Sequence, residues 1–120
     1  MTLPVTIETD ACCATAREPR VDAAEAERIA RVFKALGDPT RVKLLSLIAG
    51  GEGGEACICD LTAPVGLSQP TVSHHMRILV DAGLLTREKR GRWAHYSVVP
   101  EAFTSLAWLI ADPRRGLRTP

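Results

Sequence analysis

The stretch "GLSQPTVSHHMRILVDAGLL", residues 66–85, decides the fold. Ser68 suits a helix N-cap and Pro70 suits the first turn, while Gly83 suits the end, so we expect a helix that runs to about Ala82. At about 100° per residue, one side of this helix is apolar and the other polar. The expected apolar side holds Val72, His75, Met76, Leu79 and Val80, and the polar side holds Pro70, Thr71, His74, Arg77 and Asp81, with Gln69 and Ser73 at the edge. One side packs, and the other is free to bind a partner.

A second, shorter helix is expected just before this one. The stretch "ACICDLTAP", residues 56–64, is long enough for a short helix that ends before Pro64. Gly66 can take a positive φ and make a tight turn between the two helices. Together they predict a helix-turn-helix.

The sequence after Gly83 changes its period from 3.6 to 2. In "LLTREKRGRWAHYSVV", residues 84–99, side chains alternate along two short runs, which predicts a β-hairpin. Gly91 lies in its turn, flanked by Lys89, Arg90 and Arg92, so the tip is basic.

Three further helices are expected around this unit. The first opens at Asp22 and ends at Gly37, and its apolar stripe is Ala26, Ile29, Ala30, Phe33 and Leu36. The second starts at Pro39 and ends at Gly50. The last, "PEAFTSLAWLIAD", residues 100–112, carries the stripe Phe103, Leu106, Ala107 and Ile110.

Length and composition predict one folded domain. The chain has 120 residues, of which 46% are hydrophobic and 24% charged. We expect a flexible N-terminal arm over 1–20, the domain over 21–112 and a tail over 113–120. No secretory signal or membrane-spanning run is visible, so a cytoplasmic protein without a membrane partner is expected.

Charge is unevenly spread along the chain. Residues 1–60 carry seven basic and ten acidic side chains, whereas residues 61–120 carry eight and four. A basic second half is compatible with nucleic acid.

These elements predict an α+β, mainly α, winged helix-turn-helix that binds DNA. In such a fold the helix that starts at Ser68 is the recognition helix. Hydrogen-bonding groups at its start suit base edges or phosphates in a major groove. Those residues are Ser68, Gln69, Thr71, Ser73 and His74. Arg77 is expected to meet phosphate, and the wing residues Lys89, Arg90 and Arg92 the flanking minor groove or backbone.

Four segments carry a family resemblance: "FKALGDPTRVKLLSLI", "CICDL", "GLSQPTVSHHMRILVDAGLL" and "REKRGRWAHYSV". Over roughly residues 25–100 the chain resembles the arsenic-repressor (ArsR/SmtB) family of winged-helix metal sensors. The resemblance implies a homodimer, formed through the first and last helices, that represses transcription from an operator with an inverted repeat. It implies no enzyme activity and no small organic substrate.

The four cysteines are the candidate sensor residues. In a reducing compartment, free thiols or metal ligands are favoured over a structural disulfide. Residues two apart in a regular helix point about 200° away from each other, so Cys57 and Cys59 are not expected to bind one ion together unless the helix begins or distorts there. The remaining thiols are Cys12 and Cys13, and the family resemblance includes a pattern in which N-terminal cysteines join the helix thiols.

The identity of the inducer stays open at this point. Three thiolates in a pyramid suit As(III) or Sb(III), and the preferred three are Cys12, Cys13 and Cys57. Four thiolates suit Cd(II), Pb(II) or Zn(II). Oxidation that pairs Cys12 or Cys13 with Cys57 or Cys59 is a further alternative, while a thiol enzyme lacks both a CxxC motif and a βαβ context.

Overall fold

The computed structural model describes residues 21–112. The N-terminal arm, the C-terminal tail and the pair Cys12 and Cys13 therefore lie outside the described residues. The elements, in chain order, are α2 (Ala23–Leu36), α3 (Pro39–Ala49), β1 (Glu55–Cys57), α4 (Thr62–Val65), α5 (Gln69–Asp81), β2 (Leu85–Arg90), β3 (Trp93–Val98) and α6 (Pro100–Ala111). Two 3-10 turns, Glu52–Gly54 and Ile58–Asp60, flank β1.

Helices α2 and α3 begin and end where the caps predict. The carboxylate of Asp22 accepts a hydrogen bond from the Glu25 backbone N–H at 2.8 Å. At α3, the carboxylate of Asp38 accepts from the N–H groups of Thr40 at 2.8 Å and Arg41 at 3.2 Å. These N–H groups have no partner inside the helix, so the aspartates fix both starts.

The buried side of α2 differs from the expected stripe. Val32 and Ala35 are buried, whereas Phe33 is 44% exposed. The sequence pattern grouped Phe33 with Ile29 and Leu36, but these two lie only partly buried at the edge of the core. Part of the apolar surface of α2 is thus left facing solvent in the single chain.

The helix-turn-helix is confirmed, with a correction to its first helix. Helix α4 includes Pro64 instead of ending before it. Pro64 is tolerated because it lies in the first turn, where its missing N–H has no helical partner. Gly66 ends α4 with φ +70°, and α5 follows from its N-cap Ser68.

The residues around the cysteines form a strand, where a helix was expected. Glu55–Cys57 pairs antiparallel with β3, so that Glu55 faces Ser97 and Cys57 faces His95. Pairing with a segment 40 residues away overrides the local pattern. The hairpin is confirmed, but β1 extends it to a three-stranded sheet of order β1-β3-β2.

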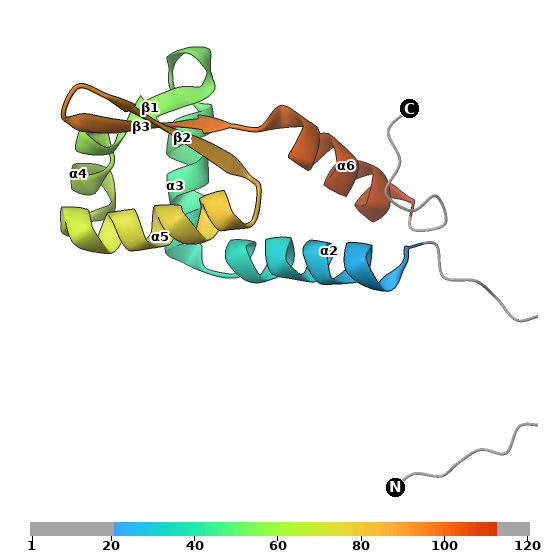
Figure 1. Cartoon of the computed structure of the whole chain (residues 1–120). Coiled ribbons are helices and arrows are strands. Elements are labelled where there is room, and N and C mark those ends of the chain that lie inside the picture. The colour runs from blue at the N-terminus through green and yellow to red at the C-terminus, as the bar shows by residue number, and fades with distance from the viewer. Residues whose placement is uncertain (1–20, 113–120) are drawn as a thin grey trace, which may run out of the picture.

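The core lies where α3, α5 and the sheet meet. Its most fully buried side chains are Leu44, Ile48, Leu61, Met76, Leu79, Leu84, Leu85 and Val72. Figure 1 shows α5 below the sheet, with α3 crossing behind, while α2 and α6 extend on the side away from the hairpin tip. The architecture is a winged helix-turn-helix, which confirms the predicted fold class.

Candidate DNA-binding surface and thiol pair

The start of α5 is fixed by its own side chains. The Ser68 hydroxyl accepts a hydrogen bond from the Thr71 N–H at 3.4 Å and lies 3.0 Å from the Thr71 hydroxyl. Both residues are exposed. The cap therefore holds two hydroxyl groups at the solvent-facing end of the helix.

The polar side of α5 lies where the periodicity predicts. Val72, Met76 and Leu79 are buried on the opposite side. Of the predicted contact residues on α5, Ser73 is half-buried and the others are exposed: Ser68, Gln69, Thr71, His74 and Arg77. A whole helix side is thus available to a partner.

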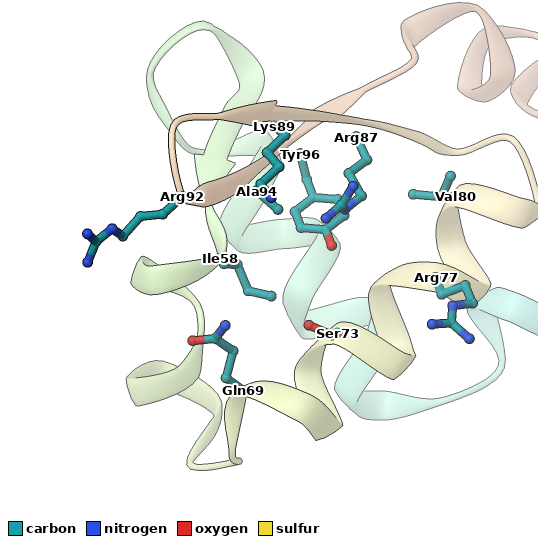
Figure 2. A pocket seen from close by; sticks show the side chains of 10 residues that line it. All are labelled: Ile58, Gln69, Ser73, Arg77, Val80, Arg87, Lys89, Arg92, Ala94 and Tyr96. Carbon is teal, nitrogen blue, oxygen red and sulfur yellow. The ribbon is translucent and has the colours of Figure 1, made fainter.

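A cavity of about 480 Å³ lies between α5 and the hairpin. The residues that line it are Ile58, Gln69, Ser73, Arg77, Val80, Arg87, Lys89, Arg92, Ala94 and Tyr96. In Figure 2, Gln69 and Ser73 point from α5 toward the hairpin, and Arg87 points from the hairpin toward α5. All four charged residues of this lining are basic, so the cavity attracts anions.

The strand register separates the hairpin side chains into two groups. Arg87 faces Tyr96 and Lys89 faces Ala94, and these pairs share the side of the sheet that looks onto α5. Because side chains alternate along a strand, Glu88 and Arg90 point to the other side. Arg87 was missed as a site residue, although its spacing of two from Lys89 already places it beside the cavity.

Arg90 is held by two carboxylates. Its Nη2 donates to Glu55 Oε1 and to Glu88 Oε1, both at 2.9 Å, and its Nη1 donates to Glu55 Oε2 at 3.4 Å. The hydrogen bonds that Arg90 donates to Glu88 and to Glu55 raise the pKa of Arg90 above its usual value. Of the three predicted wing residues, Lys89 and Arg92 line the basic cavity, and Arg90 does not.

Cys57 and Cys59 meet, contrary to the geometric expectation. That expectation assumed a regular helix, but Cys57 ends β1 and Cys59 lies in the 3-10 turn Ile58–Asp60. Their sulfur atoms are joined as a disulfide, with the Cα atoms 5.2 Å apart. The Cys59 N–H also donates to the Cys57 sulfur at 3.3 Å. This backbone therefore brings the two sulfurs together on one side of the chain.

Cys57 borders a second cavity, of about 400 Å³, on the other side of the sheet. Cys57 is 8% exposed, whereas Cys59 is exposed. Cys57, His95 and Arg90 line this cavity together with Glu55 and Asp60. Within residues 21–112, no cluster of three or more Cys, His, Asp or Glu side chains has a geometry that could hold a metal ion. The described residues thus provide two of the four predicted thiols.

Comparisons with known proteins identify the family. The family model "Bacterial regulatory protein, arsR family" matches residues 38–87. The chain is 39% identical over 86 residues to an HTH-type transcriptional regulator of Methanocaldococcus jannaschii, which covers 72% of this chain and 94% of that one. It is 41% identical over 85 residues to the arsenical resistance operon repressor of Escherichia coli, covering 71% of each chain. It is also 40% identical over 73 residues to a cadmium resistance regulatory protein CadC homolog of Staphylococcus aureus, covering 61% of this chain and 59% of that one.

Comparisons with solved structures lead to the same family. A crystal structure of an ArsR family transcriptional regulator has a TM-score of 0.66 and 28% identity, covering 74% of this chain and 89% of that one. The homodimeric winged helix-turn-helix DNA-binding domain of a Mycobacterium bovis protein, solved in solution, has a TM-score of 0.62 and 25% identity, covering 88% and 98%. None of the helices within residues 21–112 combines the length and the apolar character needed to cross a bilayer. By sequence and by fold, the chain belongs to the ArsR/SmtB family of winged-helix transcriptional regulators.

Proposed function

We propose that this protein is a homodimeric repressor that binds an inverted-repeat operator and leaves it when a thiophilic metalloid, arsenite or antimonite, binds its cysteines. The observation that carries the proposal is the position of two sites on opposite sides of one small sheet. A basic cavity faces α5 on one side, and Cys57 borders a cavity on the other. A ligand at the thiols and DNA at α5 thus act on the same strands.

The DNA side follows from charge and shape. In this proposal α5 enters the major groove and Gln69, at its first turn, reads a base edge, for which an adenine suits its amide. One DNA strand then lies between α5 and the hairpin. Its phosphates are neutralised by the four basic residues that line the cavity, Arg77, Arg87, Lys89 and Arg92.

The homodimer is supported by apolar surface on α2 and α6. Phe33 is 44% exposed and Ile110 is 62% exposed. Helices α2 and α6 lie side by side, and large exposed apolar side chains on two neighbouring helices favour a surface that a second copy covers. A two-fold axis through α2 and α6 would place two copies of α5 for two half-sites.

The metalloid side rests on the cysteine geometry. Cys57 and Cys59 bring their sulfurs together, so once reduced both can bind a single arsenic atom. The third thiolate then comes from Cys12 or Cys13, which lie outside the described residues. Binding of As(OH)₃ by three thiols forms three As–S bonds, and the three hydroxyl groups leave as water with the thiol protons. The arsenical resistance repressor among the relatives supports this choice.

Two alternatives have specific support. Four thiolates from Cys12, Cys13, Cys57 and Cys59 suit Cd(II), Pb(II) or Zn(II), and a cadmium resistance regulator is also among the relatives. A redox signal is favoured by the disulfide between Cys57 and Cys59. In that case a peroxide takes two electrons and two protons from the thiols and is reduced to water.

The test is a fluorescence anisotropy titration of the reduced protein with operator DNA. Arsenite, antimonite, cadmium, lead and zinc are added separately, and hydrogen peroxide is added in metal-free buffer. We expect arsenite and antimonite to weaken DNA binding by about 5- to 150-fold, the usual range of allosteric coupling.

Single variants separate the thiols. Cys57→Ala and Cys59→Ala are each expected to abolish release by arsenite, and the double variant of Cys12→Ala and Cys13→Ala is expected to do the same. If all of these still release the operator as the wild type does, the thiol sensor is excluded. Release by peroxide alone would select the redox alternative.

A further inference from the structure

We infer that the ion pair between Glu55 and Arg90 connects the cysteine segment to the DNA-binding hairpin, so that Arg90 is a positioning residue and makes no DNA contact. The inference builds on the proposed function for the ligand, but its first test uses no ligand. Arg90 belongs to the hairpin, and Glu55 lies two residues before Cys57 on β1.

The sheet places these residues in one surface. Cys57 faces His95, which in turn faces Glu88, so the three form a row across β1, β3 and β2. On the same side of the sheet, Glu55 lies two residues before Cys57, in the neighbouring row on one side. Arg90 lies two residues after Glu88, in the neighbouring row on the opposite side. The Arg90 side chain therefore spans the central strand β3 to reach Glu55, next to the cavity that Cys57 borders.

The connection is a specific one. Two hydrogen bonds join the guanidinium to both oxygens of Glu55, at 2.9 Å and 3.4 Å. The Arg90 side chain is 46% exposed and that of Glu55 is 33% exposed. A two-pronged contact of this kind fixes orientation as well as distance. Glu88 holds the same guanidinium, but it lies on the same strand as Arg90 and cannot join β1 to the hairpin.

The hairpin tip is where this contact acts on DNA. Arg90 ends β2 and precedes Gly91, and its neighbours Lys89 and Arg92 line the basic cavity. A ligand that binds Cys57 and Cys59 moves the end of β1 and thereby Glu55. In the resulting state the pair is broken, and the tip no longer holds Lys89 and Arg92 in place for phosphate.

The sign of the change in operator affinity caused by one substitution distinguishes this inference from a direct contact between Arg90 and DNA. Glu55→Gln removes a negative charge near the wing and breaks the ion pair with β1, while Arg90 keeps its pair with Glu88. If Arg90 binds phosphate, operator affinity rises. If the pair positions the tip, affinity without any ligand falls, by about 2- to 5-fold, as expected for a partly exposed ion pair. The matched control Glu88→Gln also removes a charge beside Arg90 but leaves the link to β1, so its affinity is expected to stay equal or rise.

The arsenite measurements extend the test. In Glu55→Gln, affinity of the arsenite-loaded protein for operator should match that of the loaded wild type, because that state has already lost the pair. By linkage, the arsenite affinity of the DNA-bound protein relative to that of the free protein should be about 2- to 5-fold higher in the variant than in the wild type. The ratio of operator affinity without arsenite to operator affinity with arsenite should not change further when Arg90→Gln is added to Glu55→Gln.

Several results overturn the inference. A rise in operator affinity for Glu55→Gln contradicts it, as does an equal fall for Glu88→Gln. Failure of the proposed function is seen separately, since the wild type would then keep its operator in arsenite while the ligand-free comparison of Glu55→Gln with Glu88→Gln still decides the role of Arg90. Thermal unfolding of each variant confirms that a change in DNA binding does not come from loss of the fold.

Discussion

Nη1 of Arg41 lies 3.1 Å from Nδ1 of His75, which joins the start of α3 to the half-buried side of α5. A guanidinium only donates, so His75 accepts through Nδ1 and carries its proton on Nε2. Nε of the same arginine donates to the backbone oxygen of Ala35 at 2.7 Å, at the end of α2. One side chain thus joins α2 and α3 to the DNA-recognition helix α5.

Replacing Arg41 by Met should lower the free energy of unfolding by about 1–3 kcal/mol, because the Ala35 carbonyl and the His75 ring lose a charged donor. The Arg41 side chain is only 15% exposed, so water does not fully replace it. Urea unfolding measures the change. Arg28→Met is the matched control: its side chain is 57% exposed, and its pair with Glu25 at 3.7 Å should contribute at most about 0.5 kcal/mol. Equal effects of the two substitutions would contradict the structural role of Arg41.

Asp38 should give the fold an acid-sensitive element. Hydrogen bonds from the backbone N–H of Arg41 and then of Thr40, with the Arg41 charge nearby, lower its pKa below the ordinary 3.8. A carboxyl with a lowered pKa stabilises the fold above its unfolded value, and this contribution is lost as the pH falls from about 3.8 toward the folded pKa. Asp38→Asn keeps a capping oxygen but cannot titrate. Urea midpoints measured from pH 6 downward should therefore fall less steeply for the variant, and parallel curves would refute the assignment.

The two sides of the basic cavity should affect DNA binding differently. Arg87→Ala should weaken binding to operator and random DNA by similar factors and reduce the slope of log affinity against log salt by about 1. Gln69→Ala should cost about 1–3 kcal/mol on the operator and relax discrimination at one base position. Anisotropy with single-base operator variants at several salt concentrations distinguishes the two. Loss of base discrimination in Arg87→Ala would show that the roles are misassigned.

The proposed dimer depends on Ile110. Its side chain is 62% exposed on α6, and burying a charge in its place would disrupt a tight interface. Ile110→Glu should raise the dimer dissociation constant by about tenfold to a hundredfold, as expected for the burial of one large aliphatic side chain. Sedimentation equilibrium measures this. Val42→Glu is the control, since Val42 is 50% exposed but lies on α3, and it should leave the dimer intact.

The recognition helix α5 could be predicted from the sequence because the signals that mark it are local. Ser68, Pro70 and Gly83 mark its ends, and the period of its apolar residues fixes which side is buried. The same reasoning found the hairpin and the turn at Gly66, whose φ of +70° is the conformation that glycine adopts most readily.

The cysteine segment could not be predicted in this way. Whether Cys57 is helical or extended depends on His95, its partner 38 residues later, and no local pattern carries that information. The pairing of Arg90 with Glu55 was hidden for the same reason, since the two lie 35 residues apart. Arg87, in contrast, was accessible: counting the hairpin in steps of two from Leu85 puts Arg87 and Lys89 on one side.

The brevity of β1 also determines where the native chain opens most easily. A strand of three residues at the edge of a sheet is held by few backbone hydrogen bonds, and its partner lies far along the sequence, so the loop it closes is long. The amide protons of residues 55–57 should therefore exchange with solvent well before those of α3 and α5, through an opening that leaves the rest of the fold closed. The segment that bears Cys57 is then also the one that unfolds locally, so a large ligand can reach the buried sulfur of Cys57 without global unfolding.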